Sequence, residues 1–212
     1  MNGMLDLERI RRAQVSDKPF AHFIVEGAIP LGDARRSAEA FPAIGEPGAK
    51  RVEETRFGPP FEELLDELKG DALRNIIAEK LGIDLTNSDI VIKVRSQSRL
   101  TDGNIHTDTP EKLVTVLLYF NEPGEAGESN LRILKNGRNL DDFIAEIPPN
   151  LGNMVVFKVT PDCWHGHKPM IGKRLSLQMN YLSGVKTRGK HQLVRRLISR
   201  TRRKLGRLVG QA

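Results

Sequence analysis

The stretch that decides the fold is residues 103–120, "GNIHTDTPEKLVTVLLYF", in which a polar segment leads into a run of β-forming residues. The run is rich in branched apolar and aromatic side chains, which is typical of a buried strand. His106 and Asp108 lie two positions apart just before it. Side chains two apart in extended backbone point to the same side. We therefore expect these two side chains to reach one point in space.

Working outward from this stretch, the period of the apolar residues changes near residue 90. Four more β-forming runs are separated by turn residues, at 90–97, 131–134, 153–159 and 173–182. Before residue 90 we predict a strand at 20–29 and helices at 4–14, 32–41 and 61–82, the last divided in two near Gly70. Helices followed by strands predict an α+β protein whose strands form a sandwich or barrel.

Length and composition favour one main domain, which we place at 1–185 with its β core at about 90–182. The single cysteine, Cys163, allows no internal disulfide, and no apolar run approaches the roughly 20 residues of a membrane span. The N-terminus has no apolar signal core. We therefore expect a cytoplasmic protein without a transmembrane segment.

The charge is unevenly distributed along the chain. Residues 186–212 hold ten Lys or Arg and no acid, whereas the rest of the chain has 23 basic residues against 27 acidic ones. Apolar residues recur at helical spacing in this tail. We consider a helix packed on the body, a membrane-surface helix, a contact with nucleic acid or another anionic partner, and dimerisation.

A second group of potential ligands lies downstream, in "CWHGHKPMIGKRLSLQMNYL" (163–182). Either His165 or His167 would complete a set of two histidines and one carboxylate on a β framework, which is the ligand set of non-haem Fe(II) sites. Arg174 begins the next strand, where its guanidinium would suit a carboxylate. Tyr119 could reach the same carboxylate from the strand 113–120.

These residues together resemble the Fe(II)- and 2-oxoglutarate-dependent dioxygenases, specifically the prolyl-4-hydroxylase-like branch. The pattern of that family is an HxD pair, a distal histidine and an Arg or Lys about ten residues beyond it. Here the pattern corresponds to His106, Asp108, His165 and Arg174, and the spacing to Arg174 favours His165 over His167. Tyr119 matches a tyrosine that contacts 2-oxoglutarate in the family.

The resemblance implies a double-stranded β-helix core, the cupin-like jelly roll, with supporting N-terminal helices. It implies a hydroxylase that uses Fe(II), 2-oxoglutarate and O₂ and releases succinate and CO₂. His106, Asp108 and His165 would hold the iron, and Arg174 with Tyr119 would hold 2-oxoglutarate. One departure is "GESNLRIL" (127–134), where many relatives have Gly-Gly-x-Leu.

The substrate, a small molecule or a peptide, is not specified by these motifs. Alternation places Lys93, Arg95, Gln97 and Arg99 on one strand face, and Arg95 and Arg99 are candidates for binding an anionic substrate. In the strand 173–182, the polar side chains Arg174, Ser176, Gln178 and Asn180 should face the barrel interior, and Gln178 is a third substrate candidate. Two rival functions are a peptidyl-prolyl hydroxylase and a catalytically retired scaffold.

Overall fold

A computed structural model describes residues 3–184 of the chain, so the predicted tail at 186–212 lies outside the described residues. The helices are α1 (Leu7–Arg12), α2 (Leu31–Glu39), α3 (Pro59–Lys69) and α4 (Asp71–Leu81), with a 3₁₀ turn at Val52–Glu54. As predicted, Gly70 separates α3 from α4. The α3 helix starts at a proline, and α4 is followed by Gly82 in the left-handed conformation, which are favoured start and stop residues.

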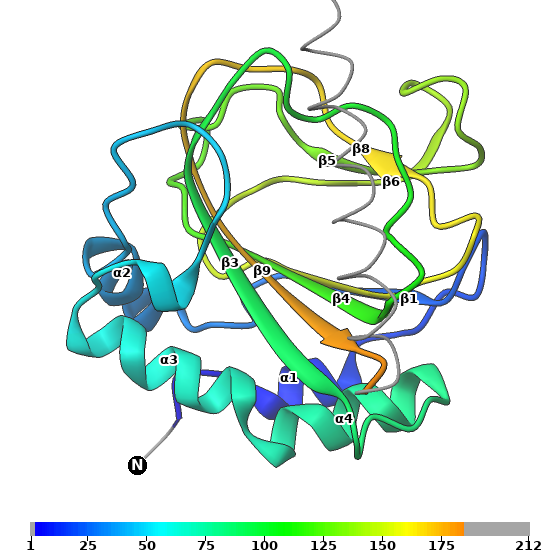
Figure 1. Cartoon of the computed structure of the whole chain (residues 1–212), viewed down its shortest axis with the longest axis horizontal. Coiled ribbons are helices and arrows are strands. Elements are labelled where there is room, and N and C mark those ends of the chain that lie inside the picture. The colour runs from blue at the N-terminus through cyan, green and yellow to red at the C-terminus, as the bar shows by residue number, and fades with distance from the viewer. Residues whose placement is uncertain (1–2, 185–212) are drawn as a thin grey trace, which may run out of the picture.

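The strands form two sheets that face each other (Figure 1). The larger sheet has the order β1-β7-β4-β9-β3-β2, and the smaller one has the order β6-β5-β8. Neighbouring strands in both sheets are antiparallel. Their bounds are β1 (His22–Val25), β2 (Lys50–Arg51), β3 (Asp89–Ser98), β4 (Lys112–Tyr119), β5 (Leu131–Leu134), β6 (Phe143–Ile147), β7 (Met154–Lys158), β8 (His165–Gly166) and β9 (Gly172–Leu182).

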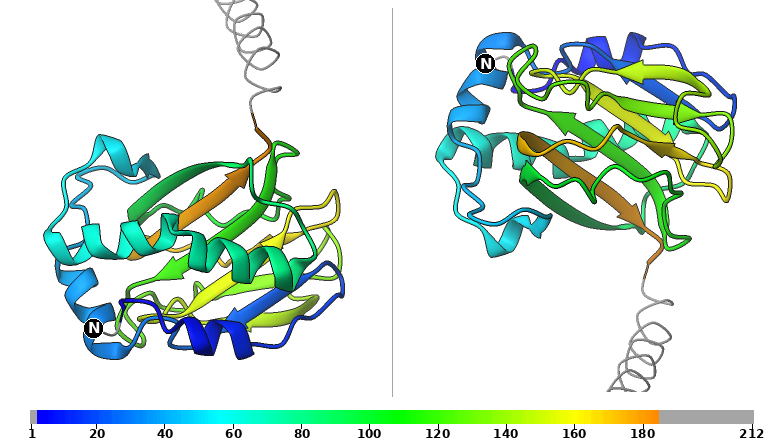
Figure 2. Two further views of the ribbon diagram at one scale, coloured as in Figure 1. Left: turned by 90° about the horizontal axis from the view of Figure 1, so that it is seen from below. Right: turned by 90° about the horizontal axis from the view of Figure 1, so that it is seen from above.

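This arrangement confirms the predicted α+β class with a jelly-roll core and supporting helices. The helices lie against the outer face of the larger sheet, as Figure 2 shows from two sides. Sequence patterns did not predict β2, β6 or β8. Two of these strands have only two residues, and β6 has just one buried residue, so their sequences carry little hydrophobic signal.

The alternation of β9 divides the interior into two regions. Leu175, Leu177 and Met179 pack in the core between the larger sheet and the helices. The intervening side chains of Arg174 and Ser176 line a cavity between the two sheets. Polar residues therefore occupy the interior side of this strand because that side borders a cavity, as the alternation predicted.

Candidate active site

A backbone bridge brings the two halves of the predicted ligand set together. The N–H of His106 donates to the carbonyl of His165 at 3.0 Å, and the N–H of His165 donates back to the carbonyl of His106 at 3.0 Å. The two ring centres lie 4.3 Å apart. The short strand β8 is fixed in turn by pairing with β5, where Ile133 is opposite His165. Residues 59 positions apart are thus held by main-chain bonds, without reliance on flexible side chains.

Hydrogen bonds to main-chain carbonyls orient both imidazole rings. Nδ1 of His106 lies 2.8 Å from the carbonyl oxygen of Asn104, and Nδ1 of His165 lies 2.8 Å from that of Cys163. A carbonyl only accepts, so each Nδ1 must carry the proton, and the lone pair is on Nε2. This is the tautomer that metal-binding histidines use when a carbonyl fixes the ring.

The carboxylate of Asp108 is buried and has a partner on each oxygen. Lys112 Nζ donates to Oδ1 at 2.5 Å, and the Thr115 hydroxyl donates to Oδ2 at 2.5 Å. Burial alone would raise the pKa of this carboxyl group, but the charge and hydrogen bond of Lys112, with the bond from Thr115, lower it below its ordinary value. Asp108 is therefore ionised at neutral pH.

One potential ligand atom each from His106, Asp108 and His165 lie within 4.8 Å of one another. Burial, and then the neighbouring His106, lower the pKa of His165 to about 4, so its ring is neutral at pH 7. Two imidazoles that both direct Nδ1 to a carbonyl, together with one ionised carboxylate, are a suitable donor set for Fe(II). The residues present therefore fit the metal that the sequence motif implies.

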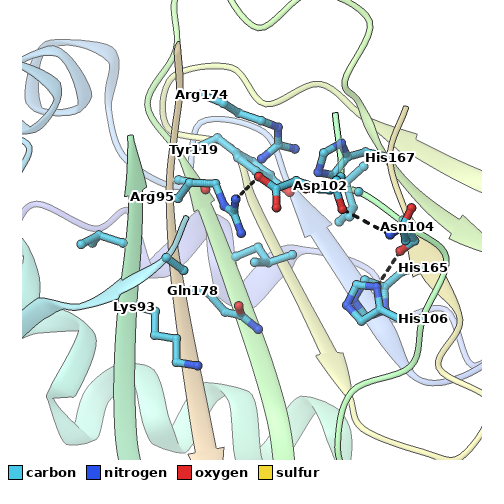
Figure 3. Close-up of a pocket in the computed structure, with 18 residues that line it drawn as sticks. Lys93, Arg95, Asp102, Asn104, His106, Tyr119, His165, His167, Arg174 and Gln178 are labelled. Carbon is cyan, nitrogen blue, oxygen red and sulfur yellow. Dashed lines mark hydrogen bonds and ion pairs between the residues drawn. The ribbon is translucent and has the colours of Figure 1, made fainter. Parts of the chain in front are cut away.

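The same histidines line a cavity of about 300 Å³ between the sheets (Figure 3). Leu117 and Leu131 contribute apolar wall, and most of the remaining lining is polar. Figure 3 shows His106 and His165 at one side of the cavity and the guanidinium groups of Arg95 and Arg174 at the other. The predicted substrate residue Gln178 also lines the cavity, from the same strand as Arg174.

Arg174 is buried and held in place by one serine. Its Nε donates to Ser129 Oγ at 3.1 Å, and its Nη2 donates to the Ser129 carbonyl at 3.0 Å. The guanidinium carbon lies 5.3 Å from the ring centre of Tyr119, whose side chain is also buried in the cavity wall. Burial raises the pKa of the Tyr119 hydroxyl, with the nearby Arg174 charge opposing it, so the phenol keeps its proton and can donate to an anion.

Arg95 and Arg99 have different environments, although alternation predicted one shared face. The register of β3 against β9 shifts between Arg95 and Gln97, which is a bulge. Arg95 stays in the cavity wall, and its Nη1 donates to Asp102 Oδ2 at 2.5 Å. Beyond the bulge Arg99 is outside the set of lining residues, with its side chain 55% exposed and its Nη2 3.7 Å from Asp102 Oδ1.

His167, the alternative distal histidine, lies in the cavity wall but outside the group of three ligand atoms. Its main-chain N–H donates to the carbonyl of Gly103 at 2.9 Å. Gly103 has a φ of +92°, and a Cβ there would lie 2.5 Å from the ring of His167. This close contact anchors the loop 99–105 against β8.

Three residues at the site were not singled out from the sequence: Thr115, Ser129 and Asp102. Strand alternation could have found Thr115, because it shares a face of 113–120 with Tyr119. Ser129 lies in the segment "GESNLRIL", which differs from the related pattern, and no local signal linked it to Arg174. The partnership of Asp102 with Arg95 depends on how the loop folds back, which sequence spacing does not specify.

Comparison with protein families supports the interpretation of this segment. The family model described as the 2OG-Fe(II) oxygenase superfamily matches residues 97–182, which include the HxD pair, the distal histidine and Arg174. Comparison with curated protein sequences gives no match. Within residues 3–184, no helix combines the length and apolar character that a membrane crossing requires.

Several solved structures that are similar to this chain are prolyl hydroxylases. A prolyl-4-hydroxylase from Pseudomonas putida has 20% identity and a TM-score of 0.55, and the match covers 84% of this chain and 97% of that one. One from Phytophthora capsici has 16% identity and a TM-score of 0.54, covering 88% and 68%. A third, from Trichoplax adhaerens in complex with a peptide fragment, has 14% identity and a TM-score of 0.52, covering 84% and 87%. At these identities the similarity establishes the fold.

Proposed function

We propose that this chain, whose residues 97–182 match the 2OG-Fe(II) oxygenase superfamily, is a member of that superfamily and a dioxygenase that hydroxylates a C–H bond of its substrate. The family uses Fe(II), 2-oxoglutarate and O₂. In the balanced reaction, R–H, O₂ and 2-oxoglutarate give R–OH, succinate and CO₂. The observation that carries the proposal is that the ligand atoms of His106, Asp108 and His165 lie within 4.8 Å of one another, and that both histidines line the same cavity as Arg174.

In this proposal, the three ligand residues are preorganised for Fe(II). The carbonyl bonds to Nδ1 keep both Nε2 lone pairs available, and the contacts of Asp108 with Lys112 and Thr115 keep the carboxylate ionised and oriented. Bound Fe(II) would supply the activation of O₂ that couples the oxidation of 2-oxoglutarate to that of the substrate.

Arg174 would bind the carboxylate of 2-oxoglutarate that is distal to the iron. The hydroxyl and carbonyl oxygens of Ser129 accept hydrogen bonds from Nε and Nη2 of Arg174, and so fix the plane of the guanidinium. The neutral Tyr119 hydroxyl is available to donate to the same carboxylate. Leu117 and Leu131 supply apolar surface that limits water around the reacting carbon.

Peptidyl-prolyl hydroxylation is the second candidate, because similar solved structures include prolyl hydroxylases, one of them in complex with a peptide fragment. A contact of the basic segment 186–212 with a membrane surface or an anionic partner is a further proposal, supported by its ten cationic residues without an acid. The cytoplasmic location inferred from cysteine usage remains a prediction.

The proposed function is tested by anaerobic titration of the purified protein with Fe(II) and 2-oxoglutarate. We expect the visible charge-transfer band of the metal-bound 2-oxo acid, followed by equal amounts of succinate and CO₂ on exposure to air. His165→Ala should abolish the band. His167→Ala is a matched control, since it changes a histidine two residues away on the same cavity wall, outside the ligand group. We expect it to keep the band.

A folded wild-type protein that binds neither Fe(II) nor 2-oxoglutarate would refute the proposal and favour the retired scaffold. If His167→Ala abolished the band and His165→Ala kept it, the ligand assignment would be wrong, although the oxygenase function would stand.

A further inference from the structure

We propose that Arg95 is the receptor for an anionic group of the substrate, a carboxylate or a phosphate, and that the carboxylate of Asp102 is an internal competitor for it. The inference rests on the proposed function, because it takes the substrate to enter the cavity that holds 2-oxoglutarate. It adds a substrate class, a small molecule bearing an anionic group, and a residue that selects it.

The position of Arg95 is the first argument. It lies on β3 opposite Ser176 of β9, and both side chains line the cavity. Lys93, two residues earlier on β3, lines the same wall opposite Gln178. Figure 3 shows Arg95 and Arg174 together at the side away from His106 and His165. A ligand bound through Arg95 would therefore extend across the cavity toward the metal ligands.

The chemistry of Arg95 is the second argument. Its side chain is only 25% exposed, and a guanidinium removed from water requires an oxyanion or several acceptors to offset the lost hydration. Arg174 is already assigned to 2-oxoglutarate and is oriented by Ser129. Arg95 is a second planar cation in the same cavity, and its geometry suits a carboxylate or a phosphate.

The third argument is that the present partner of Arg95 can leave it at low cost. The Asp102 oxygen that Arg95 contacts also accepts the main-chain N–H of Arg99 at 2.9 Å, and the other oxygen lies 3.7 Å from Arg99 Nη2. Asp102 therefore keeps two interactions on the rim after it releases Arg95. Gly103, the next residue, is fixed to His167, so the loop and Asp102 can stay in place and the exchange needs only the guanidinium of Arg95 to turn from Asp102 to the ligand.

A cavity of about 300 Å³ limits what else can enter with 2-oxoglutarate. The space suits a small anionic substituent next to the reacting carbon better than a folded segment of a macromolecule. A substrate with this group would form one charge-assisted contact with Arg95 in a mostly desolvated wall, where such contacts are stronger than in water.

The test uses the full chain loaded with Mn(II) and saturating 2-oxoglutarate, so that Arg174 is occupied. Mn(II) is paramagnetic and speeds the relaxation of nuclei close to it. Inorganic phosphate is observed by ³¹P NMR and ¹³C-labelled acetate by ¹³C NMR. The relative enhancement of their nuclear relaxation rates identifies which anion the receptor prefers. We expect saturable enhancement with at least one of them.

The two variants should change anion affinity in opposite directions. Arg95→Gln should weaken binding about tenfold, as for the loss of one charge-assisted hydrogen bond. Asp102→Asn should tighten binding about threefold or more, because it removes the competing charge while an amide oxygen can still accept from Arg99. Lys173→Gln is the matched control: it removes one positive charge beside Arg174, outside the cavity lining, and should change affinity less than twofold.

Parallel weakening by Arg95→Gln and Asp102→Asn would overturn the inference, because it would identify their ion pair as a brace for the loop. If the protein binds Mn(II) and 2-oxoglutarate but the nuclear relaxation of neither anion is enhanced, the inference would also be overturned. The proposed function would then stay intact. Weaker 2-oxoglutarate binding in Arg95→Gln, with unchanged anion binding, would assign Arg95 to the cosubstrate instead. Failure of the wild type to bind Mn(II) and 2-oxoglutarate would overturn both proposals.

Discussion

Thr115→Val isolates the contribution of one buried hydrogen bond to metal binding. The Thr115 hydroxyl lies 2.5 Å from Asp108 Oδ2 and 3.0 Å from Asn180 Oδ1, in a position without solvent exposure. Valine has nearly the same shape, so the packing of β4 should be kept. What is lost is the donor that orients the carboxylate of Asp108.

The magnitude follows from the charge on the acceptor. A hydrogen bond to an ionised group contributes about 1.5–3 kcal/mol, and the loss of a partner that orients a metal ligand typically costs about 10- to 100-fold in metal affinity. We therefore expect Thr115→Val to weaken Fe(II) or Mn(II) binding at least about tenfold. The metal-free protein should also be less stable by about 2 kcal/mol, which for a chain of this size lowers Tm by about 4–8 °C.

Metal affinity is best measured from the electron paramagnetic resonance signal of free Mn(II), with Tm from circular dichroism on the same samples. Thr115→Ser is the matched control, because it keeps the hydroxyl and removes a methyl group. It should retain affinity within about threefold, because serine can place its hydroxyl in the same staggered rotamer. Equal metal affinity in wild type and Thr115→Val would show that the Thr115 bond does not orient Asp108 for the metal.

Two further predictions concern Arg174 and His165. Ser129→Ala should weaken 2-oxoglutarate binding about fivefold without changing metal affinity, because Arg174 loses one neutral acceptor that fixes its plane; an unchanged Kd in a 2-oxoglutarate titration would refute this. In the metal-free protein, His165 has a pKa of about 4 against 6.5 when unfolded, so the unfolded state alone takes up the proton between these values. Stability should therefore fall by up to about 3 kcal/mol as pH decreases from 6.5 to 4, and urea unfolding of His165→Gln should show a smaller decrease.

Much of the fold was predictable because its long elements carry strong periodic signals. The apolar spacing of 61–82 and the β-forming runs from residue 90 correspond to α3, α4 and the central strands of the larger sheet. The alternation of β9 also predicted which side faces the cavity, because a register is specified wherever one face is buried. What sequence could not give was β8, a strand of two residues held by pairing with distant backbone.

The candidate site was predictable to the extent that its residues belong to a shared motif. The HxD pair, His165, Arg174 and Tyr119 have characteristic spacing. The structure groups the ligand atoms of His106, Asp108 and His165, and it places both histidines, Arg174 and Tyr119 in the wall of one cavity. The side chains that orient them were harder to identify. Ser129 contacts Arg174 although the two are 45 residues apart in sequence, and the register shift after Arg95 is followed by an Arg99 that lies outside the cavity lining. Neither feature has a local sequence signal.

The location of each group on the strands suggests which properties can change independently. The segment before β4 supplies two of the proposed metal ligands, and β4 itself supplies Tyr119, while β9 supplies Arg174. Arg95 lies on β3, on the far side of β9 from β4, and has no contact with the three ligand residues among its hydrogen bonds and ion pairs. Substitutions separated in this way and without shared partners are expected to act additively. A double variant of Thr115→Val and Arg95→Gln should therefore show the sum of two separate losses, one in metal affinity and one in anion affinity.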